Sequence, residues 1–234
     1  MIMIKKKHLV VLSGAGISAE SGIKTFRDSG GLWEGHDVME VASPEGWRRN
    51  RALVQNFYNL RRRQLLDCEP NEAHTILAEL ERDFQVSIIT QNVDDLHERA
   101  GSTKVIHLHG ELKKAQSSLD PSLVYNLDHW EIKEGDKCEK GSQLRPHIVW
   151  FGEQVPMMEN AIEIATTADV FVVIGTSLQV YPAASLVDFV PDSTLIYVID
   201  PKNPEVNFRR KVVNILENAT KGMKTLEKLL KSQI

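Results

Sequence analysis

The sequence is poor in cysteine, in long apolar runs and in excess charge of either sign. Its 234 residues include only two cysteines, Cys68 and Cys138, which cannot form a disulfide framework, so we expect a reducing, cytoplasmic compartment. Apolar runs reach about five residues, as at Val170–Ile174, which is too short to span a bilayer. Leu9–Leu12 is likewise too short for the apolar core of a signal peptide. The 28 Lys and Arg nearly balance the 32 Asp and Glu, which argues against a general nucleic-acid or membrane-surface binder.

Short apolar runs alternate with helical patterns along most of the chain. This alternation predicts an α/β fold, a Rossmann-like parallel sheet with helices on both faces, formed by about residues 1–28, 69–111 and 146–234 of a single domain. Residues 29–68 and 112–145 interrupt the alternation, and we predict that these insertions form a smaller module. The predicted strands are Leu9–Leu12, Val86–Thr90, Val105–Leu108, Ile148–Phe151, Val170–Ile174, Leu195–Ile199 and Val212–Ile215, and the predicted helices are Ala52–Leu66, one capped by Asn71, Met158–Thr166, Ala184–Phe189 and Thr220–Leu230.

A glycine-rich loop follows the first predicted strand. Gly14, Gly16 and Ala19 have the spacing G-x-G-x-x-A, in which glycines let backbone N–H groups approach a pyrophosphate. A hydride-transferring dinucleotide fold would continue into a second strand with an acidic residue about 20 positions on. Here the chain continues instead into Phe26 and Arg27, followed by Asp28-Ser29-Gly30-Gly31, which has the composition of a loop.

That departure is typical of one family. Ser13–Arg27, Thr90–His97, His107–Gly110 and Gly175–Pro182 resemble, in this order, the motifs of the sirtuins, and the resemblance covers nearly the whole chain. It implies a protein-lysine deacylase that consumes NAD as a co-substrate. Its expected partners are acylated lysine side chains of proteins, and its expected products include nicotinamide and O-acyl-ADP-ribose.

The resemblance implies a cofactor site at the carboxyl ends of several strands. Asn92 and Asp94 are expected at the nicotinamide end and Gln91 at its ribose, although a turn that caps a helix near Asp95 would explain the same residue types. Asp200 stands where the family usually has Asn. The expected cofactor-binding residues are Gly14, Ala15, Gly16, Ser18, Phe26, Arg27, Gln91, Asn92, Asp94, Gly175, Thr176, Ser177, Asp200 and Ala219.

His109 is the candidate catalytic base, with Asn92 as the second catalytic residue. It closes a predicted strand just before Gly110, and a histidine has a near-neutral pKa suited to accepting a proton. From spacing alone a hydrogen-bonded structural histidine is the favoured interpretation, but the resemblance matches His109 to the family's base. His107, on the same face of the strand, is expected to be structural.

The substrate site is expected around an extended segment. Arg145–Glu153 resembles the family's peptide groove, with Val149 and Phe151 lining the acyl-lysine channel and Val180 opposite. Plain core packing would equally predict burial of Val149 and Phe151. Tyr58 and Arg61 share a helix face, and with Ala42 they resemble the sirtuin branch that removes succinyl and malonyl groups. The alternative is a solvated basic face at 61–63.

Many sirtuins carry two Cys-x-x-Cys pairs before the peptide groove, but this chain has only Cys138 there. A closed structural zinc site needs four ligands, so we expect no zinc. We also expect a monomer. The competing functions are ADP-ribosyl transfer to proteins and a catalytically silent NAD-sensing module.

Overall fold

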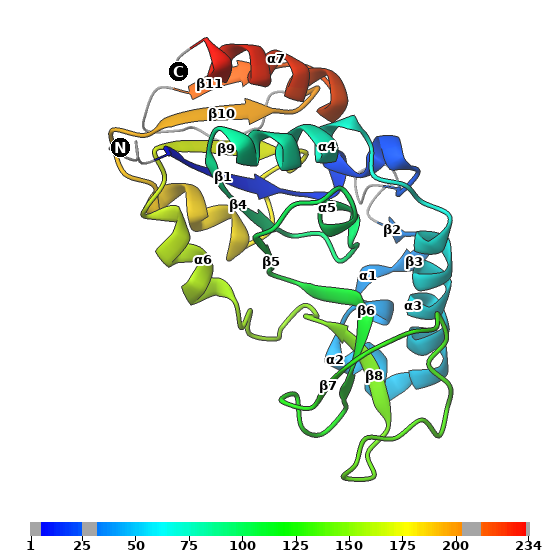
Figure 1. Cartoon of the computed structure of the whole chain (residues 1–234). Helices are drawn as coiled ribbons and strands as arrows, with labels where there is room; N and C mark the ends of the chain where they lie inside the picture. The colour runs from blue at the N-terminus through cyan, green and yellow to red at the C-terminus, as the bar shows by residue number, and fades with distance from the viewer. Residues whose placement is uncertain (1–5, 25–31, 203–211, 233–234) are drawn as a thin grey trace.

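The computed structural model describes residues 6–24, 32–202 and 212–232 (Figure 1). Its larger part is a six-stranded sheet of order β11-β10-β9-β1-β4-β5 in which every pair of neighbours is parallel. The predicted α/β fold is therefore confirmed. The strands of this sheet are β1 (His8–Ser13), β4 (Gln85–Thr90), β5 (Val105–His107), β9 (Val170–Ile174), β10 (Leu195–Ile199) and β11 (Val212–Ile215).

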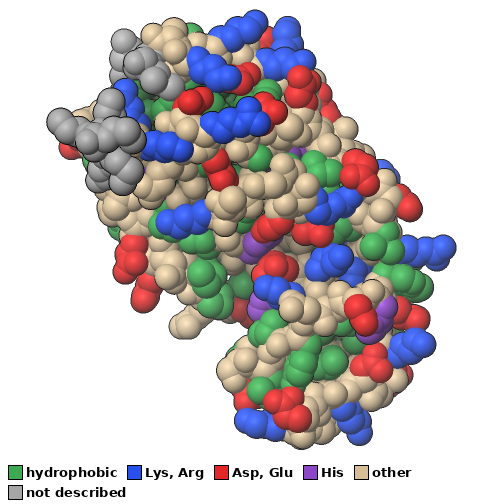
Figure 2. All heavy atoms as spheres, viewed as in Figure 1, with side chains coloured by type: hydrophobic (Ala, Val, Ile, Leu, Met, Phe, Trp, Pro, Cys, Tyr) green, Lys and Arg blue, Asp and Glu red, His purple; other side chains and the backbone are tan. Residues whose placement is uncertain are grey.

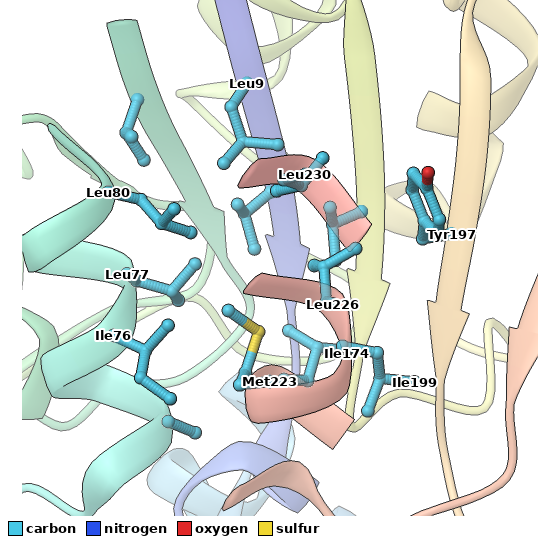
Figure 3. Packing of buried hydrophobic residues seen from close by; sticks show 14 of the residues in the cluster. Leu9, Ile76, Leu77, Leu80, Ile174, Tyr197, Ile199, Met223, Leu226 and Leu230 are labelled. Carbon is cyan, nitrogen blue, oxygen red and sulfur yellow. The ribbon is translucent and has the colours of Figure 1, made fainter. Parts of the chain in front are cut away.

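Helices cover both faces of the sheet because successive side chains of a strand point to opposite sides. Leu9 and Val11 of β1 pack with α4 (Glu72–Glu79) and α7 (Ala219–Lys231), as Figure 3 shows for the α7 residue Leu226. Val10 and Leu12 belong to the opposite core, with α6 (Met158–Ala165) and the 3₁₀ helix η5 (Ala183–Phe189). Burial on both faces explains the continuous Val and Ile runs of the sequence.

Asn71 caps α4, as predicted. Its side chain accepts a hydrogen bond from the Ala73 N–H at 3.0 Å, and the Asn71 N–H donates to His74 Nδ1 at 3.3 Å. This reciprocal capping satisfies two backbone donors at the start of the helix. The remaining short helical elements of this larger part are η1 (Ala15–Ile17), η2 (Ala19–Ser21), η4 (Leu80–Arg82) and α5 (Leu96–Arg99).

A second group of elements lies below the parallel sheet in Figure 1. Three strands pair antiparallel in the order β7-β6-β8, beside the long helix α3. The elements are β2 (Leu32–Trp33), β3 (His36–Asp37), α1 (Val38–Val41), α2 (Pro44–Arg49), α3 (Arg51–Leu66), β6 (Gly110–Ser117), β7 (Val124–Asn126) and β8 (Leu144–Ile148).

The predicted strand Ile148–Phe151 is wrong. Strand β8 ends at Ile148 and pairs with β6, outside the parallel sheet. The apolar run arises for another reason: Trp150 is 2% exposed and packs in the core of α1, α2 and α3, whereas Phe151 is 43% exposed.

Three polar side chains of α3 bind the loop that precedes β8. Gln55 and Asn59 both donate to the Ile132 carbonyl, at 3.1 and 3.0 Å, and Arg62 donates to the carbonyls of Leu112 and Trp130. Arg62 is only 1% exposed, so the alternative of a solvated basic face fails at this position. These bonds join the two segments that interrupt the strand–helix alternation.

Within the three described ranges, the helices are too short or too polar to cross a membrane.

Candidate active site

The loops after β1 and β9 are in backbone contact at the carboxyl edge of the sheet. The Gly14 N–H donates to the Ile174 carbonyl at 3.0 Å, and the Gly16 N–H donates to the Gly175 carbonyl at 2.8 Å. A Cβ on Gly16 would lie 2.6 Å from the Cα of Gly175, which itself has a φ of +63°. Glycine is thus required by the contact of the two loops.

These bonds alter the expected role of the glycine amides. Because Gly14 and Gly16 use their N–H groups inside the protein, they cannot donate them to a pyrophosphate without rearrangement. Among the described residues, the Ala15 N–H has no hydrogen-bond partner, as is usual for the first residue of a helical turn. The Ala15 N–H is therefore open to a ligand phosphate, which fits an NAD-type ligand at this edge.

A buried polar cluster joins the loop after β1 to the loop after β4. Asn92 Nδ2 donates to Ser18 Oγ at 3.1 Å, and Ser18 Oγ donates to Asp94 Oδ2 at 3.1 Å. Asp94 also accepts the Leu96 N–H at 3.2 Å, so the turn-capping reading holds at the same time. Burial raises the pKa of Asp94, although the bonds from Leu96 and Ser18 oppose this. Gln91 Nε2 donates to Thr176 Oγ1 at 3.0 Å and so links the β4 and β9 loops.

His109 is fixed in one tautomer. Its Nδ1 lies 3.0 Å from the Gln91 carbonyl oxygen, and since a carbonyl only accepts, Nδ1 carries the proton. Nε2 then presents a lone pair and has no hydrogen-bond partner among the described residues. Burial lowers the pKa of His109, with the Gln91 contact opposing. A neutral imidazole with an open nitrogen is the form that a general base requires.

His107 contacts the next carbonyl of the same loop. Its Nδ1 lies 3.0 Å from the Asn92 carbonyl oxygen, and its Nε2 lies 2.8 Å from Glu98 Oε1. Burial alone would lower the pKa of His107, but the hydrogen bond and charge of Glu98 outweigh it and raise the pKa. Both ring nitrogens are engaged, as expected for a structural histidine. In the view of Figure 2, histidine side chains are visible where the larger part of the molecule meets the second group of elements below it.

Sequence reasoning missed two buried histidines behind this cluster. His97 Nε2 lies 3.0 Å from Ser13 Oγ, and His74 Nε2 lies 3.5 Å from Ser18 Oγ, with the two rings 5.0 Å apart. Burial lowers the pKa of both, to about 4 for His74. Both rings are therefore neutral at physiological pH and act as hydrogen-bond partners of Ser13 and Ser18. Two sequence features could have indicated them: His97 ends the Thr90–His97 motif, and His74 follows the helix cap Asn71 by three residues.

The expected substrate residues lie on backbone-linked segments. The Val149 N–H donates to the His109 carbonyl and the Phe151 N–H donates to the Ala42 carbonyl, both at 2.9 Å. Both the channel interpretation and the core-packing alternative predicted burial of Phe151, so its 43% exposure contradicts that prediction without deciding between them. Val180 is 37% exposed, so both side chains are accessible to a partner.

Tyr58 and Arg61 make separate contacts on α3. Tyr58 is fully buried and its hydroxyl accepts a hydrogen bond from Trp150 Nε1 at 3.1 Å. Arg61 Nη1 lies 3.3 Å from Glu34 Oε1. Burial raises the pKa of Tyr58 and lowers that of Arg61, where the Glu34 charge opposes the shift. The phenol therefore stays neutral and the guanidinium stays charged at neutral pH.

The other expected cofactor residues lie further along the sheet edge. Asp200 is 4% exposed directly after β10 and accepts the Lys202 N–H at 2.9 Å, and Ala219 is buried at the start of α7. Ser177 follows Thr176 in the β9 loop and is half-buried. Phe26 and Arg27 lie outside the described residues.

Cys68 and Cys138 are both free thiols. No three His, Cys, Asp or Glu side chains of the described ranges are grouped so that they could hold a metal ion.

A parallel α/β sheet with glycine loops and polar side chains at its carboxyl edge defines a dinucleotide-binding class of protein. A model of the Sir2 family matches residues 14–182, so the chain belongs to the Sir2 family. It is 58% identical over 220 residues to an NAD-dependent protein deacylase of Helicobacter pylori (strain J99), covering 94% of each chain. It is 54% identical over 229 residues to an NAD-dependent protein deacylase of Bacteroides thetaiotaomicron, covering 96% of this chain and 98% of that one. A solved Sir2 homologue–NAD complex has a TM-score of 0.87 at 39% identity, covering 97% of this chain and 91% of that chain.

Proposed function

We propose that this chain is an NAD-dependent protein-lysine deacylase. The observation that carries the proposal is the locked tautomer of His109, whose Nε2 is open while its carbonyl holds Val149 of the expected substrate segment. Membership of the Sir2 family and identities of 54–58% to proteins named NAD-dependent protein deacylases support the same activity.

Bound NAD would supply a ribose carbon from which nicotinamide can depart. Ala15 N–H would bind a phosphate oxygen, and Asn92 and Asp94, fixed through Ser18, would face the nicotinamide end. His109 Nε2 would accept a proton from a ribose hydroxyl, because its lowered pKa keeps the ring neutral at physiological pH. No zinc takes part in this scheme.

The favoured substrates are lysines that carry an acidic acyl group, succinyl or malonyl, as well as acetyl-lysine. The neutral Tyr58 hydroxyl accepts from Trp150 and keeps its own proton to donate, and Arg61 supplies a positive charge one helical turn away. Buried Ala42 adds little bulk beside Phe151. Together these groups suit a distal carboxylate.

The test is incubation of the purified protein with NAD and matched acetyl-, succinyl- and malonyl-lysine peptides, with mass analysis of all products. Deacylation predicts free lysine peptide, nicotinamide and O-acyl-ADP-ribose in equal amounts. A peptide or protein that gains ADP-ribose would establish the transferase alternative, and NAD binding without turnover would establish the silent module.

Arg61→Met tests the acyl preference. A charge-assisted hydrogen bond is worth about 1.5–3 kcal/mol, so kcat/KM for the succinyl peptide should fall by about tenfold or more. Acetyl turnover should change much less. Arg63→Met is the matched control because Arg63 is exposed, whereas Arg62 is buried and unsuitable. Equal loss on both peptides would mean that Arg61 is structural.

A further inference from the structure

The turn between β2 and β3 holds a residue that is unfavourable for its backbone conformation. Glu34 has a φ of 51° and Gly35 a φ of 84°, so both central residues of this two-residue hairpin turn are left-handed. Turns of this kind favour Asn-Gly or Asp-Gly, and a longer side chain at the first position adds steric cost. A strained residue of this kind points to a role for its side chain.

The Glu34 carboxylate lies between two cations. Its Oε1 is 3.3 Å from Arg61 Nη1, and its Oε2 is 3.4 Å from Lys24 Nζ. The side chains of Glu34 and Arg61 are 17% and 18% exposed, while that of Lys24 is 70% exposed. The contact with Arg61 is therefore the better shielded of the two and is less weakened by salt.

Glu34 leaves two nitrogens of the Arg61 guanidinium without a hydrogen bond. Arg61 Nε and Nη1 are buried, and neither makes a hydrogen bond to a described residue, so the 3.3 Å contact with Glu34 is an ion pair without hydrogen-bond geometry. The Phe57 ring lies 5.1 Å from the guanidinium carbon. A guanidinium prefers a bidentate carboxylate partner, so a better-placed carboxylate can replace Glu34 at this guanidinium.

Aromatic contacts fix the hairpin on the same face of α3 that bears Tyr58 and Arg61. The Trp33 ring packs edge-to-face on Phe57 and Tyr58, with centroids 5.0 and 5.9 Å apart. His36 packs on Phe57 at 5.7 Å. The turn thus holds the Glu34 carboxylate at the guanidinium to which the proposed function assigns the acyl carboxylate.

We propose that Glu34 is an internal competitor for Arg61 that sets the acyl preference of the enzyme. The proposal rests on the assignment of Arg61 to acidic acyl groups. With an acetyl-lysine substrate, Glu34 keeps its pair with Arg61. With a succinyl- or malonyl-lysine substrate, two carboxylates meet at one guanidinium, and the substrate binds only as Glu34 gives way. Glu34 therefore lowers the affinity for acidic acyl groups and leaves acetyl binding unchanged.

The test compares Glu34→Gln and Glu34→Asn with the wild type on succinyl- and acetyl-lysine peptides at saturating NAD. Gln keeps the shape of the side chain, whereas Asn suits the turn and secures a folded variant. For both variants, we expect KM for the succinyl peptide to fall by about three- to tenfold, in the range of a partly shielded charge contact. The acetyl KM should change less than about twofold. Glu40→Gln is the control for net charge, because Glu40 is exposed and forms no ion pair with another described residue.

Arg61→Met separates the two proposals. If it leaves the succinyl-to-acetyl ratio unchanged, the assignment of Arg61 fails, and the role of Glu34 fails with it. If Arg61→Met lowers succinyl turnover selectively but both Glu34 variants leave the succinyl KM unchanged or raise it, only the competitor role is overturned. A fall in KM for both peptides, or the same fall in Glu40→Gln, would show a general charge effect and would also overturn it.

Discussion

The Val149 N–H donates a hydrogen bond to the carbonyl of His109 at 2.9 Å. The candidate base and the segment expected to bind the peptide are thus joined through their backbones. The same segment is bound two residues later to Ala42, which directly follows α1. Displacing this segment would therefore displace the residues around the candidate base, so we expect peptide position and activity to be coupled.

Replacing His109 tests the base directly. His109→Ala should lower deacylation by about 10²–10⁴-fold, the usual contribution of a general base, with the fold retained. Because burial lowers the pKa of His109, the ring is neutral already at slightly acidic pH, and the acidic limb of kcat should lie below the ordinary value of 6.5. The measurements are kcat against pH for the wild type and turnover for the variant.

The exposed His129 provides the matched control, and His129→Ala should behave as wild type. Near-normal turnover by folded His109→Ala, or an acidic limb above pH 6.5, would contradict the assignment.

Arg62 should stabilise the protein without taking part in recognition. Arg62→Met removes donors from the buried carbonyl of Leu112 and the partly buried carbonyl of Trp130. A hydrogen bond from a charged donor is worth about 1.5–3 kcal/mol, so the free energy of unfolding should fall by about 3 kcal/mol. Urea unfolding measures this, with the exposed Arg63→Met as control. An unchanged urea midpoint would show that these carbonyls find other partners.

Sequence patterns predicted the parallel sheet well because it is buried on both faces. The bounds of Val170–Ile174, Leu195–Ile199 and Val212–Ile215 agree with β9, β10 and β11. The antiparallel strands β6 and β8 were not predicted, since β6 carries polar residues and β8 contains Pro146. Local patterns cannot reveal such long-range pairing.

The site residues were predictable where a motif ends a strand and unpredictable where their partners are distant. His109, Asn92 and Asp94 follow strand ends, so topology brings them to one edge. The use of the Gly14 and Gly16 amides by the β9 loop depends on residues 160 positions away along the chain, as in the bond from Gly14 to Ile174. The burial of Arg62 beside exposed Arg63 likewise depends on the loop at Trp130, which helical spacing cannot indicate.

The chain should fold and act without zinc. Cys138 lies in a turn where its sulfur is 3.1 Å from Ser142 Oγ, and the nearby core of Ala115, Leu127 and Ile132 is apolar. A structural zinc site needs four ligands. Where such a site exists, removal of the zinc ion unfolds the small module that it holds together. Metal analysis should find less than stoichiometric zinc, and chelators should leave both melting temperature and deacylation unchanged. One zinc per chain whose removal lowers both would refute this.

The pair of His107 and Glu98 should give the protein a pH-dependent stability. The pKa of His107 is raised, so its contribution is complete below the ordinary value of 6.5 and is lost as the pH rises through the higher value in the folded state. The pKa of Glu98 is lowered, despite the opposing effect of its burial, so its contribution to stability is present above 4.5 and is lost as the pH falls through the lower folded value.

Glu98→Gln should therefore destabilise the protein most between about pH 5 and 6.5 and much less at pH 9. The loss should be about 1 kcal/mol or less, because the Glu98 side chain is 41% exposed and water screens the pair. Urea unfolding of both proteins across this pH range measures the difference, and a loss that is equal at pH 5.5 and 9 would show that the pair does not depend on a charged His107.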